Sequence, residues 1–297
     1  MSISKEEEEE TREKNSVLQG MWTLFGKDLK GWYKNYAALF IALTQPVVWL
    51  VLYGKAIDYS AIFTNGAFNI PGVNLSKQFL DSLSAQFIQT TFGTSDYFSF
   101  LTAGMLAFIV LFGASFSGIT LVFERRGGFL IKVITTPVSR GVIVWSKVLS
   151  SVLKSLVQAA ILLVVGVLLG LQTAHLSVQA LLETFGALSL LAVGLSSIFM
   201  MTALRTTNWQ LQLSIMNFIS LPLLFASNAL FPVKFMPIWL QYIASLNPMS
   251  YAADAARQLL LGSPGMVSLQ LDFQFLFAFA AFFLVTGSFL SQRYLAR

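Results

Sequence analysis

The chain has 297 residues, of which 56% are hydrophobic and only 11% are charged. About 25% of the residues in an ordinary globular domain are charged, so these few charges could not coat a soluble protein of this size. The charges are also clustered, which leaves apolar stretches of about the 20 residues that one helical membrane crossing needs. The composition therefore indicates an integral membrane protein.

The residue types also exclude most kinds of catalytic site. Cysteine is absent and histidine occurs once, at His175, which excludes disulfides and thiol nucleophiles and leaves no metal cluster. The Gly-Lys pairs at Gly26 and Gly54 lack the glycine five residues earlier that a phosphate-binding P-loop requires. We expect no catalytic residue, metal ligand or cofactor-binding residue in this chain. Nucleic acid is not an expected partner either, because the basic residues flank apolar spans as topology control requires.

The N-terminal 35 residues divide into two parts before the first apolar span. Residues 1–16 contain a run of glutamates, which is typical of a solvated, disordered acidic tail. Residues 17–35 place apolar side chains at steps of three and four, with Lys27, Lys30 and Lys34 off that stripe. This pattern predicts an amphipathic helix lying in the cytoplasmic interface of the membrane. A soluble helix packed on a partner protein is the alternative.

Residues 36–297 form the transmembrane domain, for which we predict an all-α fold with six membrane-spanning helices. The six predicted spans are Tyr36–Ala56, Tyr97–Phe123, Val144–Leu171, Leu176–Leu204, Trp209–Phe231 and Leu271–Leu290. Of the 19 lysines and arginines, all but Lys55, Lys77, Lys234 and Arg257 fall on one side of this arrangement. The positive-inside rule therefore places both termini in the cytosol of a multi-pass protein of the cytoplasmic membrane.

Two outer connections carry more than simple turns. The loop at residues 57–96 contains Leu80, Leu83, Phe87 and Ile88, a spacing that predicts a short amphipathic helix. Residues 232–262 contain two short apolar segments broken by prolines, which predicts a re-entrant hairpin that enters the outer leaflet without crossing it. A simple surface loop is the alternative. The hairpin residues that support this prediction are Pro232, Pro237, Asn247, Pro248, Tyr251, Asp254 and Arg257, with Asn247 as an N-cap and Gly262 as a helix stop.

Few polar side chains lie within the predicted spans. Glu183 lies near the outer interface, where a hydrated or hydrogen-bonded structural role is favoured over a functional one. Gln45, Asn217 and Asn228 could line a polar pathway, but hydrogen bonding between helices explains them equally well. The aromatic residues Phe108 and Phe112 in the second span are compatible with binding drugs or lipids, and are also what lipid-facing helices contain. These residues form a candidate substrate path: Gln45, Phe108, Phe112, Asn217 and Asn228.

The cytosolic loop at residues 124–140 reads ERRGGFLIKVITTPVSR and is more elaborate than a turn between two spans. If residues 128–136 are helical, Phe129 and Val133 share one face and Leu130 and Ile134 share another. Pro137 would end this helix, and Arg140 would mark the return to lipid. Such a helix suits a groove on a partner protein, although an interfacial loop with its apolar residues in lipid is an equal alternative.

Several short motifs resemble the type-2 ATP-binding-cassette export permeases. They are Glu124-Arg125, Gly128, Leu130, the run from Thr136 through Pro137 to Arg140, Phe231-Pro232, Met236-Pro237 and LNPMSYAADAAR. Their order, with the six-span layout, makes the chain resemble this family over nearly its whole length, and most of all its drug- and antibiotic-resistance branch. Where the family often has Gly-Thr-Leu-Glu, this chain has Gly128-Phe129-Leu130-Ile131, so we expect a more apolar partner groove or a different register of the loop.

The resemblance implies how such a protein would work. It implies a permease that pairs with a second permease subunit in the lipid membrane and binds two separate ATPase subunits, which hold ATP and magnesium. It also implies that the loop contacts the ATPase through Glu124, Arg125, Arg126, Gly128, Phe129, Leu130, Val133, Ile134, Thr136, Pro137 and Arg140. The expected function is ATP-driven export of an amphipathic drug-like or lipid-like substrate. A self-contained secondary transporter or channel is the alternative, against which the scarcity of charge within the predicted spans and the lack of paired broken helices count. Substrate identity, and homodimer or heterodimer assembly, stay open.

Overall fold

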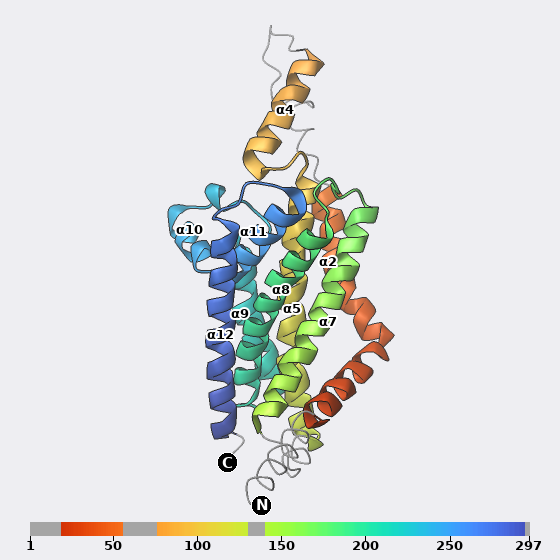
Figure 1. The fold of residues 1–297 in the computed structure, drawn as a ribbon, viewed down its shortest axis with the longest axis vertical. Helices are drawn as coiled ribbons and strands as arrows, with labels where there is room; N and C mark the ends of the chain where they lie inside the picture. The colour runs from red at the N-terminus through yellow and green to blue at the C-terminus, as the bar shows by residue number, and fades with distance from the viewer. Residues whose placement is uncertain (1–18, 56–75, 130–139, 295–297) are drawn as a thin grey trace, which may run out of the picture.

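A computed structural model describes residues 19–55, 76–129 and 140–294 (Figure 1). Within these ranges the chain is helical, and no β-strand occurs in them. Residues 19–33 form an N-terminal helix that is followed, after a short turn, by the first of the longer elements. These elements are α2 (Tyr36–Lys55), α4 (Lys77–Phe92), α5 (Tyr97–Arg126), α7 (Arg140–Leu168), α8 (Val178–Ala203), α9 (Trp209–Phe225), the 3-10 turn η1 (Val233–Phe235), α10 (Ile238–Ser245), α11 (Pro248–Leu261) and α12 (Leu269–Tyr294).

Four of the described segments are long and apolar enough to cross a membrane. They contain α5, α7, α8 and α12. Two further apolar stretches, Leu39–Lys55 in α2 and Trp209–Phe225 in α9, are shorter. At 17 residues, α9 is about 26 Å long, at the lower limit for spanning a hydrocarbon core about 30 Å thick. The all-helical fold is thus confirmed, whereas the count of six spans stays a prediction.

The predicted fifth span is longer than the helix that the structure contains. We predicted Trp209–Phe231, but α9 ends at Phe225 and residues 226–231 form turns. Pro222 lies in the last turn of α9, and Ser227 Oγ accepts a hydrogen bond from the amide of Ala229, which holds the chain in a turn there. Hydrophobicity alone could not show this boundary, because the turn residues are themselves largely apolar.

Helix α5 is the central element of the bundle. It packs against α2, α7, α8, α9 and α11, and its side chains are buried along most of its length. Helix α12 completes the bundle by packing against α7, α8 and α11 (Figure 1). A helix that is apolar on all sides, such as α5, is expected to be buried in this way.

The two ends of the bundle differ. The N-terminal helix and the C-terminal end of α12 lie at one end, whereas α10 and α11 lie at the other and α4 projects beyond them (Figure 1). The positive-inside rule assigns the end of the bundle with the N-terminal helix and the C-terminal end of α12 to the cytosol. We refer to the two ends as the predicted cytosolic end and the predicted outer end.

The predicted outer end contains the helices that local sequence signals indicated. Helix α10 begins after Pro237, and α11 begins after the N-cap Asn247, whose side chain accepts a hydrogen bond from the amide of Met249. Gly262 ends α11 with a φ of 63°, in the left-handed region that favours glycine. Helix α4 confirms the amphipathic helix expected between the first two spans. Whether α10 and α11 enter the membrane as a re-entrant hairpin stays a prediction.

Gly104 in α5 allows the turn after α9 to approach the bundle core closely. A Cβ atom at this position would lie 2.0 Å from the carbonyl oxygen of Ala229. We therefore expect Gly104→Ala to lower the free energy of unfolding by about 2 kcal/mol, since overpacking forces the backbone apart. Unfolding by sodium dodecyl sulfate in maltoside micelles measures this. The control is Gly31→Ala, where a Cβ atom meets nothing within 4 Å and helix propensity favours alanine. Equal losses of unfolding free energy in both variants would contradict the prediction.

Candidate functional site

Four charged side chains meet at the predicted cytosolic end, where the N-terminal helix, the end of α5 and the first turns of α7 come together. Lys147 Nζ lies 2.8 Å from Asp28 Oδ1 and 2.5 Å from Glu124 Oε2. Lys27 Nζ lies 2.7 Å from Glu124 Oε1. We call Lys27, Asp28, Glu124 and Lys147 the ion cluster. It joins three elements that are up to 119 residues apart in the sequence.

The inner half of the ion cluster is shielded from solvent. The side chains of Lys147 and Asp28 are only 5% and 4% exposed, whereas that of Lys27 is 43% exposed. Buried charges are tolerated when they are paired, and removing one partner leaves the other without compensation. The pairing of Lys147 with two carboxylates therefore fixes the N-terminal helix against α5 and α7.

The described part of the 124–140 loop is attached to the same cluster. The ring of Phe129 lies 3.2 Å from Lys27 Nζ, which makes a cation–π contact. The guanidinium of Arg125 donates a hydrogen bond to the carbonyl of Leu204 at the end of α8. Gly128 has a φ of 71°, which lets the chain leave α5 in a left-handed turn. Arg126 is exposed to solvent.

The remaining predicted ATPase-contact residues cannot be placed. Leu130, Val133, Ile134, Thr136 and Pro137 lie outside the described residues, and of Arg140 only the backbone, as the first residue of α7, is described. The predicted short helix and its docking role therefore stay predictions.

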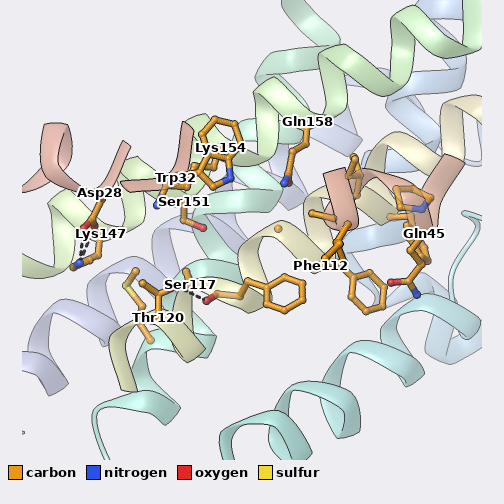
Figure 2. Close-up of a pocket in the computed structure, with 18 residues that line it drawn as sticks. Asp28, Trp32, Gln45, Phe112, Ser117, Thr120, Lys147, Ser151, Lys154 and Gln158 are labelled. Carbon is orange, nitrogen blue, oxygen red and sulfur yellow. Dashed lines mark hydrogen bonds and ion pairs between the residues drawn. The ribbon is translucent and has the colours of Figure 1, made fainter. Parts of the chain in front are cut away.

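A cavity of about 440 Å³ lies directly beside the ion cluster, between the N-terminal helix, α2, α5 and α7 (Figure 2). Asp28 and Lys147 belong to both the cluster and the cavity wall. The wall is largely apolar and aromatic. Besides Asp28 and Lys147, its polar side chains are those of Gln45, Ser117, Thr120, Ser151, Lys154 and Gln158. Its volume falls within the range of about 300–1,000 Å³ that is usual for small-molecule sites.

The candidate substrate path divides into two groups in the structure. Gln45, Phe108 and Phe112 line the cavity, and the rings of the two phenylalanines are 4.8 Å apart. Asn217 lies exposed on α9, away from this cavity. Asn228 lies buried at the predicted outer end, where its side-chain amide donates to Asp254. The structure therefore does not bring these five residues together.

Glu183 has the structural environment that the sequence favoured. Its Oε1 accepts a hydrogen bond of 2.8 Å from Gln179 Nε2, one helical turn earlier on α8. The carboxylate is thus satisfied within its own helix, at the end of α8 nearer the predicted outer side.

Sequence reasoning missed three charged residues of this site. Lys147 and Lys154 were counted only as positive charges near the cytosolic loop, although both fall inside the predicted third span. In the structure both lie on α7 and line the cavity. Sequence reasoning also overlooked Asp28, which is buried on the N-terminal helix. The signal for Asp28 was its place between Phe25 and Trp32, three and four residues away, on the apolar stripe of an amphipathic helix.

At the predicted outer end, Arg257 binds α11 to α5 and to the turn after α9. Its guanidinium donates to the carbonyls of Phe100, Asn228 and Ala229 at 3.1, 2.6 and 2.7 Å, and it lies 3.5 Å from the centre of the Phe100 ring. Burial lowers the pKa of Arg257 to about 9, so the guanidinium stays protonated at neutral pH. Nearby, Asp254 accepts from the amides of Met266 and Val267, although burial raises the pKa of its carboxyl.

The other residues predicted in the hairpin have structural contacts. The Asn247 side chain also donates to the carbonyls of Leu223 and Ala226, which ties the start of α11 to the end of α9. Tyr251 donates to the carbonyl of Ser245 and stacks on Phe275 of α12. Pro232 precedes η1, and Pro248 occupies the first turn of α11. These contacts fix the hairpin on the bundle and provide no evident chemistry.

In the described residues, a helical bundle with several membrane-length apolar helices, and with a largely apolar cavity beside a loop at one end, is typical of a polytopic membrane protein of the transport type. The sequence of residues 19–261 matches the ABC-2 type transporter family. The chain belongs to this family of permeases, which form the membrane part of ABC transporters and work with ATPase subunits. It is a transport component rather than an enzyme.

Individual relatives support this assignment. The chain is 31% identical to a putative transport permease, ycf38, of Porphyra purpurea over 226 residues, which is 76% of this chain and 68% of the relative. It is 28% identical over 175 residues to the daunorubicin resistance ABC transporter permease protein DrrB1 of Streptomyces coeruleorubidus, covering 58% and 60% of the two chains. It is 25% identical over 262 residues to nodulation protein J of Sinorhizobium fredii, covering 86% and 97%.

Proposed function

We propose that this chain is the membrane-spanning subunit of an ATP-driven exporter that moves an amphipathic drug-like or lipid-like compound out of the cytoplasm. Two permease subunits, identical or different, would pair in the membrane, and two separate ATPase subunits would bind the loop at residues 124–140. ATP and magnesium would be held by those ATPase subunits. Membership in the ABC-2 family supports the transport role, and a relative named for daunorubicin resistance supports the amphipathic substrate.

One observation carries the coupling mechanism: the ion cluster is shared between the base of the loop and the wall of the cavity. Glu124 and Phe129 stand at the start of the loop, while Asp28 and Lys147 line the cavity. A displacement of the loop would therefore move charged groups in the cavity wall directly. No intervening element is needed to connect the ATPase contact with the substrate space.

The proposed cycle follows from this connection. Closure of the two ATPase subunits on ATP would press on the loop and shift the end of α5 and the start of α7. The N-terminal helix would follow, because Asp28 and Lys27 bind it to both of those elements. The cavity, which the N-terminal helix helps to enclose, would then change its access from one side of the membrane to the other.

The test is co-purification of the ATPase in a mild detergent. We expect an ATP-binding-cassette ATPase from native membranes to co-purify with the native protein and to be lost with the Leu130→Asp, Ile134→Asp double variant, because carboxylates would be forced into an apolar groove. Mass spectrometry identifies and quantifies the bound ATPase.

A matched control separates docking from a general effect of added charge. Phe79→Asp, Phe87→Asp introduces the same two carboxylates on α4, which projects beyond the bundle at the predicted outer end and where both native side chains are exposed. This control should retain the ATPase. If neither the native protein nor the control binds an ATPase, a self-contained transporter becomes the better interpretation. The test of that interpretation is whether transport depends on a pH gradient.

A further inference from the structure

Lys154 is a positively charged side chain placed deep within a membrane-spanning helix. It lies 14 residues after Arg140, the first residue of α7, which is about 21 Å along the helix axis. Its side chain lines the cavity beside the ion cluster (Figure 2). A charge at such a depth is costly, so lysines there usually face a cavity and mark the pathway of a substrate or ion.

The ion cluster does not neutralise Lys154. The cluster contains two lysines and two carboxylates, and both carboxylates bind Lys147 or Lys27. Among the residues that the structure describes, Lys154 forms no salt bridge and no hydrogen bond, and it interacts at longer range with all four charges of the ion cluster, two of each sign. Lys154 therefore gives the cavity a net positive charge.

The cavity around Lys154 has a polar part, formed by Lys154 and Gln158, and an apolar part, formed by phenylalanines of α5. Gln158 follows Lys154 by one helical turn, so both side chains project from the same face of α7, and Gln158 is buried and lines the cavity. Its amide can donate hydrogen bonds to an oxygen anion. Phe108, Phe112 and Phe116 of α5 form an apolar aromatic wall of the same cavity.

We propose that the cavity binds an amphipathic anion, with a carboxylate or phosphate group at Lys154 and Gln158 and a hydrocarbon part along the phenylalanines of α5. A volume of about 440 Å³ suits a single-chain or drug-sized molecule. This inference rests on the proposed transport function and deepens it, since it assigns the charge of the substrate class. A cationic amphiphile would meet an unfavourable potential at Lys154.

Direct binding to the purified full-length protein in dodecyl maltoside tests this assignment. The probe is 2-bromododecanoate, whose bromine lies next to the carboxylate and quenches tryptophan fluorescence on contact. We expect saturable quenching of the cavity residue Trp32, identified by its loss in Trp32→Phe. Lys154→Met should weaken binding by about tenfold or more, since it removes a charge-assisted contact, whereas Lys154→Arg should bind within a few fold of the native protein.

Two controls separate charge recognition from structural damage. The neutral analogue 2-bromododecanol should bind native and Lys154→Met proteins equally, and Lys77→Met, which removes the same charge from an exposed site on α4, should bind the anion normally. Equal binding of the anion to native and Lys154→Met proteins would overturn the assignment. A parallel loss of the alcohol would also overturn it, because the lysine would then only maintain the fold.

Competition distinguishes the source of the anion. Displacement of the probe by phosphatidylglycerol, but not by phosphatidylcholine, would support an anionic headgroup of a bilayer lipid as the occupant. Failure of both lipids to displace a Lys154-dependent probe would support a free single-chain amphiphile. Because this assay needs no ATPase, a negative result overturns the anion site while leaving the exporter proposal to be judged by co-purification.

Discussion

Lys147→Met is expected to lower the free energy of unfolding by about 3 kcal/mol or more, because it leaves the buried carboxylate of Asp28 and that of Glu124 without their shared partner. Methionine preserves most of the side-chain volume, so the loss reports on charge rather than on packing. Unfolding by sodium dodecyl sulfate in mixed micelles provides the measurement. Lys30→Met, at an exposed position of the N-terminal helix, should change stability by less than about 0.5 kcal/mol.

A double-mutant cycle attributes this loss to the ion pair. Asp28→Asn together with Lys147→Met should cost less than the sum of the two single variants, by about 1–2 kcal/mol. This follows because the second substitution removes a charge that the first has already left unpaired. Strict additivity would mean that the two side chains are not coupled, and would remove the proposed link between the N-terminal helix and α7.

Arg257→Met is expected to destabilise the protein by about 3 kcal/mol or more. The substitution leaves the buried carbonyls of Phe100, Asn228 and Ala229 without their donor, and each unsatisfied buried group costs about 1–3 kcal/mol. Arg257→Lys should recover only part of the loss, because an ammonium lacks the planar fork that reaches several acceptors at once. The same unfolding titration measures both variants.

The matched control for Arg257 is Arg293→Met, which removes a guanidinium from an exposed position near the end of α12. Its stability should stay close to that of the native protein. If Arg257→Lys were as stable as the native protein, the three carbonyls would not depend on the fork, and the account of how the outer hairpin is fastened would be wrong.

The parts of the fold that depend on local chemistry could be predicted from the sequence. Asn247 before Pro248 and Gly262 after an apolar run determine the start and end of α11, because helix capping involves only neighbouring residues. The long apolar helices were predictable for the same reason, as their hydrophobicity is continuous. The end of α9 was not, since Pro222 and the turn after it lie within an apolar sequence.

The charged site depends on contacts between distant residues, and these could not be predicted. Asp28 and Lys147 are 119 residues apart, and nothing in either neighbourhood identifies the other. Lys154 was counted with the cytosolic charges because positive residues near a span usually set topology. Only the position of α7 beside α2 and α5 shows that this lysine faces a cavity.

Asp28 and Lys147 form part of the cavity wall and part of the ion cluster at the base of the loop. Two binding events that alter the same charged pair are thermodynamically linked, and such linkage is reciprocal. If an occupant of the cavity raises the affinity of the permease for its ATPase, the bound ATPase must raise the affinity for that occupant by the same factor. A compound that fills the cavity without disturbing this pair would bind without changing the affinity for the ATPase. It would therefore compete with the substrate for the cavity but would not itself be transported.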